Sequence, residues 1–216
     1  MTATTIDPAQ AEAFAGRAFS DATATMTVLM AAIGDKLGLF KSLASDGSAT
    51  SVALAARTDT NERYVREWLG CLSSAGYLRY DPASGQFALP AEHVPVLAAE
   101  NGPLFMGGIY QQTIALLPVV AAVIDAFRQG GGVAQAVYGE DLWEGMERFS
   151  AGIYEHLLVP VWLAALPDVV AKLEQGARVA GLSQAKLTEL ARAAGFGGVR
   201  RLPLDTPLNA VYELRL

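Results

Sequence analysis

The feature that most constrains the fold of this chain is the junction Arg178-Val179-Ala180-Gly181-Leu182. Before it, residues 163–176 predict an amphipathic helix that ends at a glycine, and residues 177–180 read as the start of a buried strand. In a nucleotide-binding α/β domain, such a strand leads into a glycine-rich turn whose backbone N–H groups contact the cofactor. Here the strand runs directly into residues 183–194, which predict another helix.

The rest of the C-terminal sequence is too short for a doubly wound sheet. Residues 199–204 and 210–216 read as strands, and the turn Asp205-Thr206-Pro207 separates them. We expect these two strands to pair as an antiparallel hairpin. Because a lone hairpin is only marginally stable, the strand at 177–180 is expected alongside it or shared with a second subunit.

The composition is apolar, with 52% hydrophobic and 18% charged residues. This surplus indicates a buried oligomer interface or an apolar pocket. A membrane span is not expected, because the longest apolar stretch, residues 113–127, contains Pro118 and Asp125 and is shorter than a bilayer requires. The N-terminal sequence has no signal-peptide pattern, so we expect a cytoplasmic protein.

Charge and metal-binding residues exclude further classes of function. The net charge of −6 opposes broad affinity for nucleic acids or anionic membranes. One cysteine, Cys71, excludes an intrachain disulfide framework and is expected to be a small core residue. Because His93, His156 and Cys71 lie far apart in sequence, no metal site is predicted.

The N-terminal segment predicts a helical interface. Residues 11–19 and 23–45 are expected to form helices. Their apolar residues recur at spacings of three and four: Met26, Leu29, Met30, Ile33, Leu37 and Phe40. We expect this stripe to form a homodimer interface.

The next segment has the element order of a winged helix. Helices are expected at 52–57, capped by Thr50 or Ser51, and at 62–75, and strands at 77–80 and 86–89. Residues 41–90 hold five basic and five acidic side chains, so the module lacks the positive surplus that phosphate binding requires. Binding to DNA is therefore not favoured.

Residues 91–176 are expected to be helical, with breaks at 101–103 and 129–132. The glycines at 130–132 follow a helix instead of a strand, so they do not form a phosphate-binding loop. A polar-aromatic loop is expected at 137–143, followed by a helix at 144–158 that Pro160 limits.

Six stretches of the sequence, distributed between residues 37 and 216, carry a resemblance to a known family: residues 37–40, 61–69, 75–89, 153–160, 176–179 and 187–216. In them the chain resembles bacterial class I S-adenosylmethionine-dependent methyltransferases with an N-terminal winged-helix domain. The resemblance implies helices that cover a substrate and a Rossmann-like cofactor domain. In that family, an acidic residue and a G-x-G-type loop follow the strand matched here by residues 177–180. This sequence lacks both, so tight binding of S-adenosylmethionine and methyl transfer are not expected.

Two sets of residues are candidates for chemistry. His156, which follows Glu155, could deprotonate a substrate hydroxyl as a general base. Neighbours on a helix point to different faces, so a purely structural histidine is the alternative. A second set could line a pocket for a small hydrophobic substrate or could equally form core: Phe105, Tyr110, Gln111, Gln112, Tyr138, Trp143, Phe149 and Tyr154.

Together these observations predict a mainly α fold with a small β component. Dimerisation helices are expected at 1–46, the winged helix at 47–92, a helical substrate-covering region at 93–176, and a remnant of the Rossmann-like domain at 177–216. The resulting hypothesis is a small-molecule methyltransferase relative that lacks its cofactor core. The alternatives are a non-catalytic dimer that binds a small ligand and a winged-helix transcriptional regulator.

Overall fold

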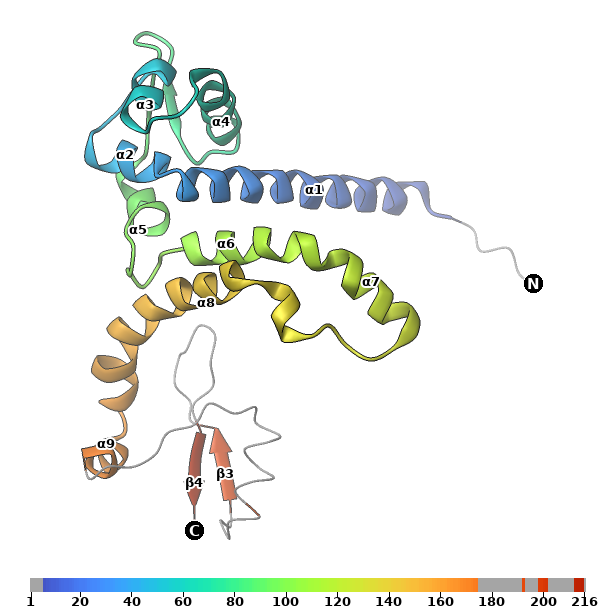
Figure 1. Ribbon diagram of the computed structural model, residues 1–216, viewed down its shortest axis with the longest axis vertical. Helices are drawn as coiled ribbons and strands as arrows, with labels where there is room; N and C mark the ends of the chain where they lie inside the picture. The colour runs from blue at the N-terminus through green and yellow to red at the C-terminus, as the bar shows by residue number, and fades with distance from the viewer. Residues whose placement is uncertain (1–5, 175–191, 193–197, 202–211, 216) are drawn as a thin grey trace. The chain divides into compact units, whose positions relative to one another are not determined.

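The computed structural model describes residues 6–174, 192, 198–201 and 212–215. The chain divides into two compact units, Met1–His156 and Leu157–Leu216, which are described separately (Figure 1). The described residues are mainly helical, with two short antiparallel sheets, which confirms the predicted fold class. The predicted four-part division of the chain stays a prediction.

The N-terminal unit begins with one long helix, α1 (Pro8–Lys36). Its 29 residues give it a length of about 43 Å. The Asp7 side chain caps it by accepting a hydrogen bond from the Ala9 N–H at 2.9 Å. The break predicted at residues 20–22 is wrong, because no glycine or proline interrupts the helix there. The chain breaks instead at Gly38, which has a φ of +70°, before α2 (Leu39–Ser45).

The winged helix is confirmed. Helix α3 (Ser51–Arg57) begins at Thr50, whose hydroxyl accepts the Ala53 N–H at 3.2 Å. Helix α4 (Glu62–Ser74) ends before Gly76, which has a φ of +79°. Cys71, in α4, is half-buried.

The wing is the hairpin of β1 (Arg79–Asp81) and β2 (Gln86–Ala88). Tyr80 stands opposite Phe87 in the antiparallel register, and an isolated bridge joins Phe87 to Ala49. The three segments close one end of the winged-helix core, so the small β component contributes directly to packing.

Trp68 of α4 is the centre of that core. Its ring packs edge-on against Phe40, with centroids 5.0 Å apart, and its Nε1 donates to the Met30 carbonyl at 2.8 Å. Helix α1 crosses this ring at Gly34, where a Cβ would lie 2.3 Å from the indole. The predicted stripe therefore divides: Phe40 is buried in the core, whereas Met26 and Ile33 remain exposed.

A group of shorter helices completes the N-terminal unit: η1 (Ala91–His93), α5 (Val94–Leu97), α6 (Gly107–Leu116), η2 (Leu117–Val119), α7 (Val120–Gln129), η3 (Gln135–Tyr138) and α8 (Glu140–Ile153). Helix α6 packs against both α1 and α8, as Figure 1 shows. Helix α8 begins at Glu140, directly after Gly139 with its φ of +73°, so Trp143 is helical and the loop predicted there is shorter.

Pro160 does not limit the helix as predicted. Helix α8 continues into η4 (Tyr154–Leu163), a π-helix that contains Pro160. A proline disrupts the i→i−4 pattern of an α-helix, whereas the wider π turn changes that pattern at the same place.

The second unit contains α9 (Pro167–Glu174), β3 (Gly198–Arg201) and β4 (Tyr212–Arg215). The two strands pair antiparallel, with Val199 opposite Leu214, as predicted. The predicted strand at 177–180, the junction and most of the predicted helix at 183–194 lie outside the described residues.

Candidate functional site

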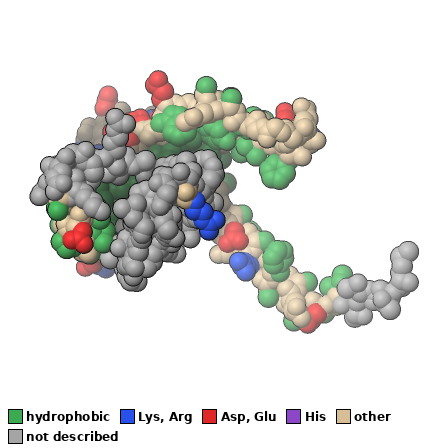
Figure 2. Space-filling model, turned by 90° about the horizontal axis from the view of Figure 1, so that it is seen from below, with side chains coloured by type: hydrophobic (Ala, Val, Ile, Leu, Met, Phe, Trp, Pro, Cys, Tyr) green, Lys and Arg blue, Asp and Glu red, His purple; other side chains and the backbone are tan. Residues whose placement is uncertain are grey.

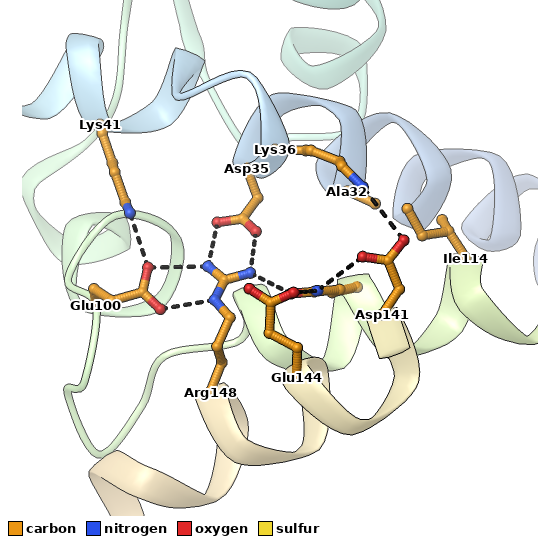
Figure 3. A pocket seen from close by; sticks show the side chains of 10 residues that line it. Ala32, Asp35, Lys36, Lys41, Glu100, Ile114, Asp141, Glu144 and Arg148 are labelled. Atoms are coloured by element: carbon orange, nitrogen blue, oxygen red, sulfur yellow. Dashed lines mark hydrogen bonds and ion pairs between the residues drawn. The ribbon is translucent and has the colours of Figure 1, made fainter. Parts of the chain in front are cut away.

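A polar cavity of about 310 Å³ lies among α1, α2, α6 and α8 of the N-terminal unit (Figure 3). The lining residues are Ala32, Asp35, Lys36, Lys41, Glu100, Gln111, Ile114, Asp141, Glu144 and Arg148. Seven of them are charged, one is an amide and only two are aliphatic. The cavity is therefore suited to a polar ligand, and the small hydrophobic ligand expected from sequence stays a prediction.

Glycines allow the two helices beneath the cavity to approach closely. A Cβ on Gly108 of α6 would lie 2.4 Å from the Gly145 carbonyl oxygen of α8. The Gln112 amide donates to both glycine carbonyls at 3.2 Å. This contact places Gln111 and Arg148, each about one turn beyond a glycine, on facing surfaces.

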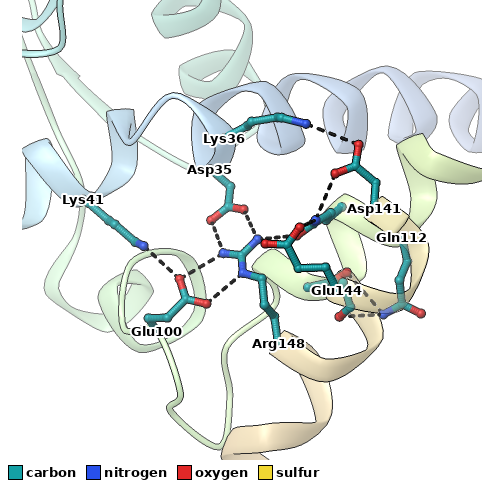
Figure 4. A network of polar contacts seen from close by, with 11 residues as sticks. Asp35, Lys36, Lys41, Glu100, Gln112, Asp141, Glu144 and Arg148 are labelled. Atoms are coloured by element: carbon teal, nitrogen blue, oxygen red, sulfur yellow. Dashed lines mark hydrogen bonds and ion pairs between the residues drawn. The ribbon is translucent and has the colours of Figure 1, made fainter. Parts of the chain in front are cut away.

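Arg148 is the centre of the polar network (Figure 4). Its guanidinium donates to Asp35 at 2.9 and 3.2 Å, to Glu100 at 2.8 and 2.9 Å, and to the Gln111 carbonyl oxygen at 2.7 Å. The guanidinium carbon also lies 5.3 Å from the centroid of the Phe105 ring. These bonds use all five N–H donors that a guanidinium has. Arg148 therefore has no donor left for an anionic ligand.

The tight half of the network consists of Arg148, Asp35, Glu100 and Lys41. Its charges compensate one another, and we call it the clamp. The hydrogen bonds that Arg148 donates to Glu100 raise the pKa of Arg148 and lower the pKa of Glu100, so both stay charged. Lys41 adds a second cation, 2.8 Å from Glu100. Because the Asp35 side chain is only 5% exposed, its charge depends on Arg148 for compensation.

The loose half of the network consists of Gln111, Asp141, Glu144 and Lys36, and most of its contacts are longer. The Gln111 amide donates to Glu144 at 3.0 Å and to Asp141 at 3.3 Å. Lys36 lies 3.4 Å from Asp141, and its side chain is 63% exposed. Gln111, which is itself buried, thus connects the tight half of the cavity to the loose half.

Of the residues predicted to form a pocket, one lines the cavity and two others are buried without lining it. Gln111 lines the cavity, and Phe105 is buried beneath Arg148. Tyr110 is buried, with its hydroxyl 3.5 Å from that of Tyr77. Burial raises the pKa of Tyr110, so its phenol remains neutral.

The other candidates lie elsewhere. Tyr138 borders an apolar groove described below, Phe149 follows the glycine contact on α8, and Trp143 and Tyr154 are exposed. His156 is exposed in η4. A catalytic role for His156 and a substrate-binding role for the aromatic residues stay predictions.

None of the seven charged residues that line the cavity was predicted from the sequence as a site residue. Asp35 and Arg148 are 113 positions apart, and Glu100 lies in a loop before α6. Charged residues on amphipathic helices ordinarily face water, so no local pattern distinguishes these from solvated ones. Only Gln111 was predicted as a site residue and lines the cavity, because a polar residue within an apolar helix stands out in the sequence.

A second, apolar groove of about 470 Å³ runs along α7. It is lined by Leu116, Val119, Val120, Val123, Ile124, Phe127, Arg128 and Tyr138. The Phe127 side chain is 89% exposed. Two helical segments project from the unit, and we call them the apolar arms: one contains α7 and the other is the N-terminal part of α1 (Figure 1). Figure 2 shows hydrophobic side chains along both; the α1 arm is the one that ends in grey residues. Large apolar side chains also remain uncovered on α1, among them Phe14 and Phe19.

Helix α4 is the second helix of the helix-turn-helix, and its positive charges are paired within the helix. Arg63 pairs with Glu67 and Arg66 with Glu62, each one turn apart. These pairs remove the positive surplus that phosphate contacts require, in agreement with the balanced charge of the sequence.

Two further features bear on the class of protein. Among the described residues, no group of three or more His, Cys, Asp or Glu side chains could hold a metal ion. Helix Gly107–Gln129 has the length and hydropathy of a membrane span, and 28% of its most apolar window is buried. It is longer than the 15-residue stretch expected from sequence, and one such helix is weak evidence for a membrane span.

Comparison with known proteins agrees with this architecture. Residues 24–99 match the family model of the Rv2258c-like winged HTH domain. The structure titled PigF with SAH is similar with a TM-score of 0.56 and 20% identity, over 84% of this chain and 63% of that one. The mitomycin 7-O-methyltransferase MmcR is similar with a TM-score of 0.50 and 18% identity, over 68% of this chain and 46% of that one. A search of curated proteins found no match.

The chain therefore carries an Rv2258c-like winged HTH domain within a fold that it shares with S-adenosylmethionine-dependent methyltransferases. At these identities the likeness concerns the fold alone. The chain spans less than two thirds of the length of either structure.

Proposed function

We propose that the chain is a dimeric relative of small-molecule methyltransferases that keeps the winged helix and the helical substrate-covering part but does not transfer methyl groups by itself. The observation that carries this proposal is the fold match over 84% of the chain, which leaves over a third of the PigF structure without a counterpart. The chain therefore shares the fold of only part of such an enzyme.

The sequence supports the loss of the methyl-donor site. Residues 177–180 are followed by Gly181-Leu182-Ser183, with no acidic residue and no G-x-G loop. Without these groups, backbone N–H donors for the methionine part and a carboxylate for the ribose are lacking. We infer that S-adenosylmethionine binds no more tightly than about 1 mM, or about −4 kcal/mol.

The two apolar arms support a homodimer. Uncovered side chains on α1 include Phe14, Phe19, Met26 and Ile33, and those on α6 to α7 include Leu116, Leu117, Val120, Ile124 and Phe127. Apolar patches of this extent on a soluble protein mark interaction surfaces. A second copy presents the same residues, so the patches are complementary in hydrophobicity.

Calorimetric titration with S-adenosylmethionine and S-adenosylhomocysteine tests the central claim, with the PigF protein, which was solved with the latter ligand, as the positive control. We expect heat of binding from PigF and none from this chain. Micromolar affinity of this chain for either ligand would refute the proposal.

A second candidate, a non-catalytic protein that binds a small ligand, is favoured by the apolar groove along α7. The two functions are distinguishable, because a hydrophobic ligand should bind in the complete absence of S-adenosylmethionine. A fluorescent apolar probe whose emission changes on binding, and is lost in Val120→Asp, would support the groove as the site.

A further inference from the structure

The loose half of the polar cavity has unused capacity to accept hydrogen bonds. Within the described residues, one oxygen of Glu144 accepts the Gln111 amide and the other accepts none. Asp141 holds its two partners at 3.3 and 3.4 Å, near the limit for a hydrogen bond. Two carboxylates thus line the hollow, and the Lys36 ammonium contacts one of them, Asp141, at 3.4 Å (Figure 3).

The charges around the cavity select the sign of a ligand. Four carboxylates (Asp35, Glu100, Asp141 and Glu144) and three cations (Lys36, Lys41 and Arg148) line it, which leaves one negative charge uncompensated. Arg148 has no free N–H donor for an anion. The carboxylates do not converge closely enough to form a metal site in the described part of the chain. A monovalent cation larger than a metal ion is consistent with the single uncompensated negative charge and with the spacing of the carboxylates.

The two aliphatic lining residues indicate what such a cation carries. Ala32 and Ile114 line the same hollow as Asp141, on the helices that face it. Ala32 is already buried, whereas Ile114 is half-buried, so an alkyl chain of a few carbons attached to the cation would cover Ile114. The cavity, at about 310 Å³, has the size of the smaller ligand pockets of proteins.

We propose that this cavity binds a small organic cation, a primary alkylammonium, whose head donates hydrogen bonds to Glu144 and Asp141 and whose alkyl part lies on Ile114. The ligand displaces the Lys36 ammonium from Asp141. Gln111, fixed on its other side by Arg148, holds the two carboxylates in place. This site requires neither methyl transfer nor dimerisation.

The test uses the full chain and n-butylammonium as the probe, followed by NMR chemical-shift changes or calorimetry, with butyrate as the anionic control. We expect saturable binding of n-butylammonium and none of butyrate. Glu144→Gln should weaken binding at least tenfold, because the amide keeps an acceptor oxygen for Gln111 but loses the charge that the ammonium needs. The matched control is Glu147→Gln, an exposed carboxylate on the same helix that does not line the cavity.

The variant Lys36→Met distinguishes a ligand-binding role of the cavity from a purely structural one. Removing the competing ammonium should tighten n-butylammonium binding several-fold, whereas loss of a structural ion pair would leave it unchanged or weaker. Unfolding midpoints of all variants verify that each is folded. No binding by the folded wild-type protein up to about 10 mM, or equal binding by the Glu144 and Glu147 variants, would overturn the proposal.

Discussion

Replacing Gly108 with alanine should separate the two helices that support the polar cavity. The new Cβ would lie 2.4 Å from the Gly145 carbonyl oxygen and 2.5 Å from the Phe149 backbone nitrogen. Both are backbone atoms, which cannot rotate away as a flexible side chain would. Helices α6 and α8 must therefore move apart by roughly 1 Å to reach ordinary van der Waals contact at about 3.4 Å.

The net effect is a difference of two terms. Overpacking of this kind costs about 1–3 kcal/mol, and a clash with backbone belongs at the upper end. Alanine regains about 1 kcal/mol of helix propensity over glycine. We therefore expect Gly108→Ala to lower the free energy of unfolding by roughly 2 kcal/mol. For a unit of this size, the unfolding midpoint should fall by about 4–8 °C.

Urea denaturation followed by circular dichroism measures this change. Gly70→Ala is the matched control, because Gly70 lies in helix α4 and a Cβ there meets nothing within 4 Å. The control should be stabilised by about 0.5–1 kcal/mol. If Gly108→Ala were as stable as Gly70→Ala, the close approach of α6 and α8 would be refuted.

Four further outcomes follow from the described contacts. Arg148→Met leaves the buried Asp35 carboxylate without its cation, and we expect a loss of about 3 kcal/mol in urea denaturation; a neutral effect would contradict the clamp. Because the folded-state pKa of Glu100 lies below its unfolded value, its contribution to stability is present above that unfolded value, about pH 4.3, and is lost as the pH falls through the folded pKa. Unfolding midpoints against pH should show this loss, and Glu100→Gln should flatten it. Ile33→Glu, at an exposed position of α1, should convert the proposed dimer to monomer in light scattering without unfolding it; a wild-type monomer at micromolar concentration would exclude the dimer. Gel shifts should show no salt-sensitive binding to arbitrary duplex DNA, because Arg63 and Arg66 are paired within α4.

The winged helix could be predicted from sequence because its signals are local. Thr50, Gly76 and the turn at 81–85 each act within a few residues of the boundary that they set. The predicted helix boundaries were wrong where the surrounding structure, and not the local sequence, determines whether a helix continues. The chain at 20–22 contains helix-compatible residues and stays helical, and Pro160 is accommodated by a π-helix instead of ending the segment.

The polar cavity could not be predicted in the same way. Its residues become neighbours only because Gly108 and Gly145 bring α6 and α8 together, and a glycine in a helix carries no sign of what lies opposite. The pairing of Asp35 with Arg148 depends on that approach and on the path of α1. Local sequence patterns report periodicity and caps, whereas this site depends on contacts over more than a hundred positions.

The hydrogen-bond network around Arg148 extends beyond the residues that the winged HTH family model matches. The winged HTH family model covers residues 24–99, so it includes Asp35 but stops one residue before Glu100 and well before Arg148. A fragment cut at those boundaries would retain a carboxylate that is shielded from water in the whole unit and would lose the guanidinium that compensates it. The segment that the family model matches is therefore smaller than the compact unit that contains it, which extends to His156.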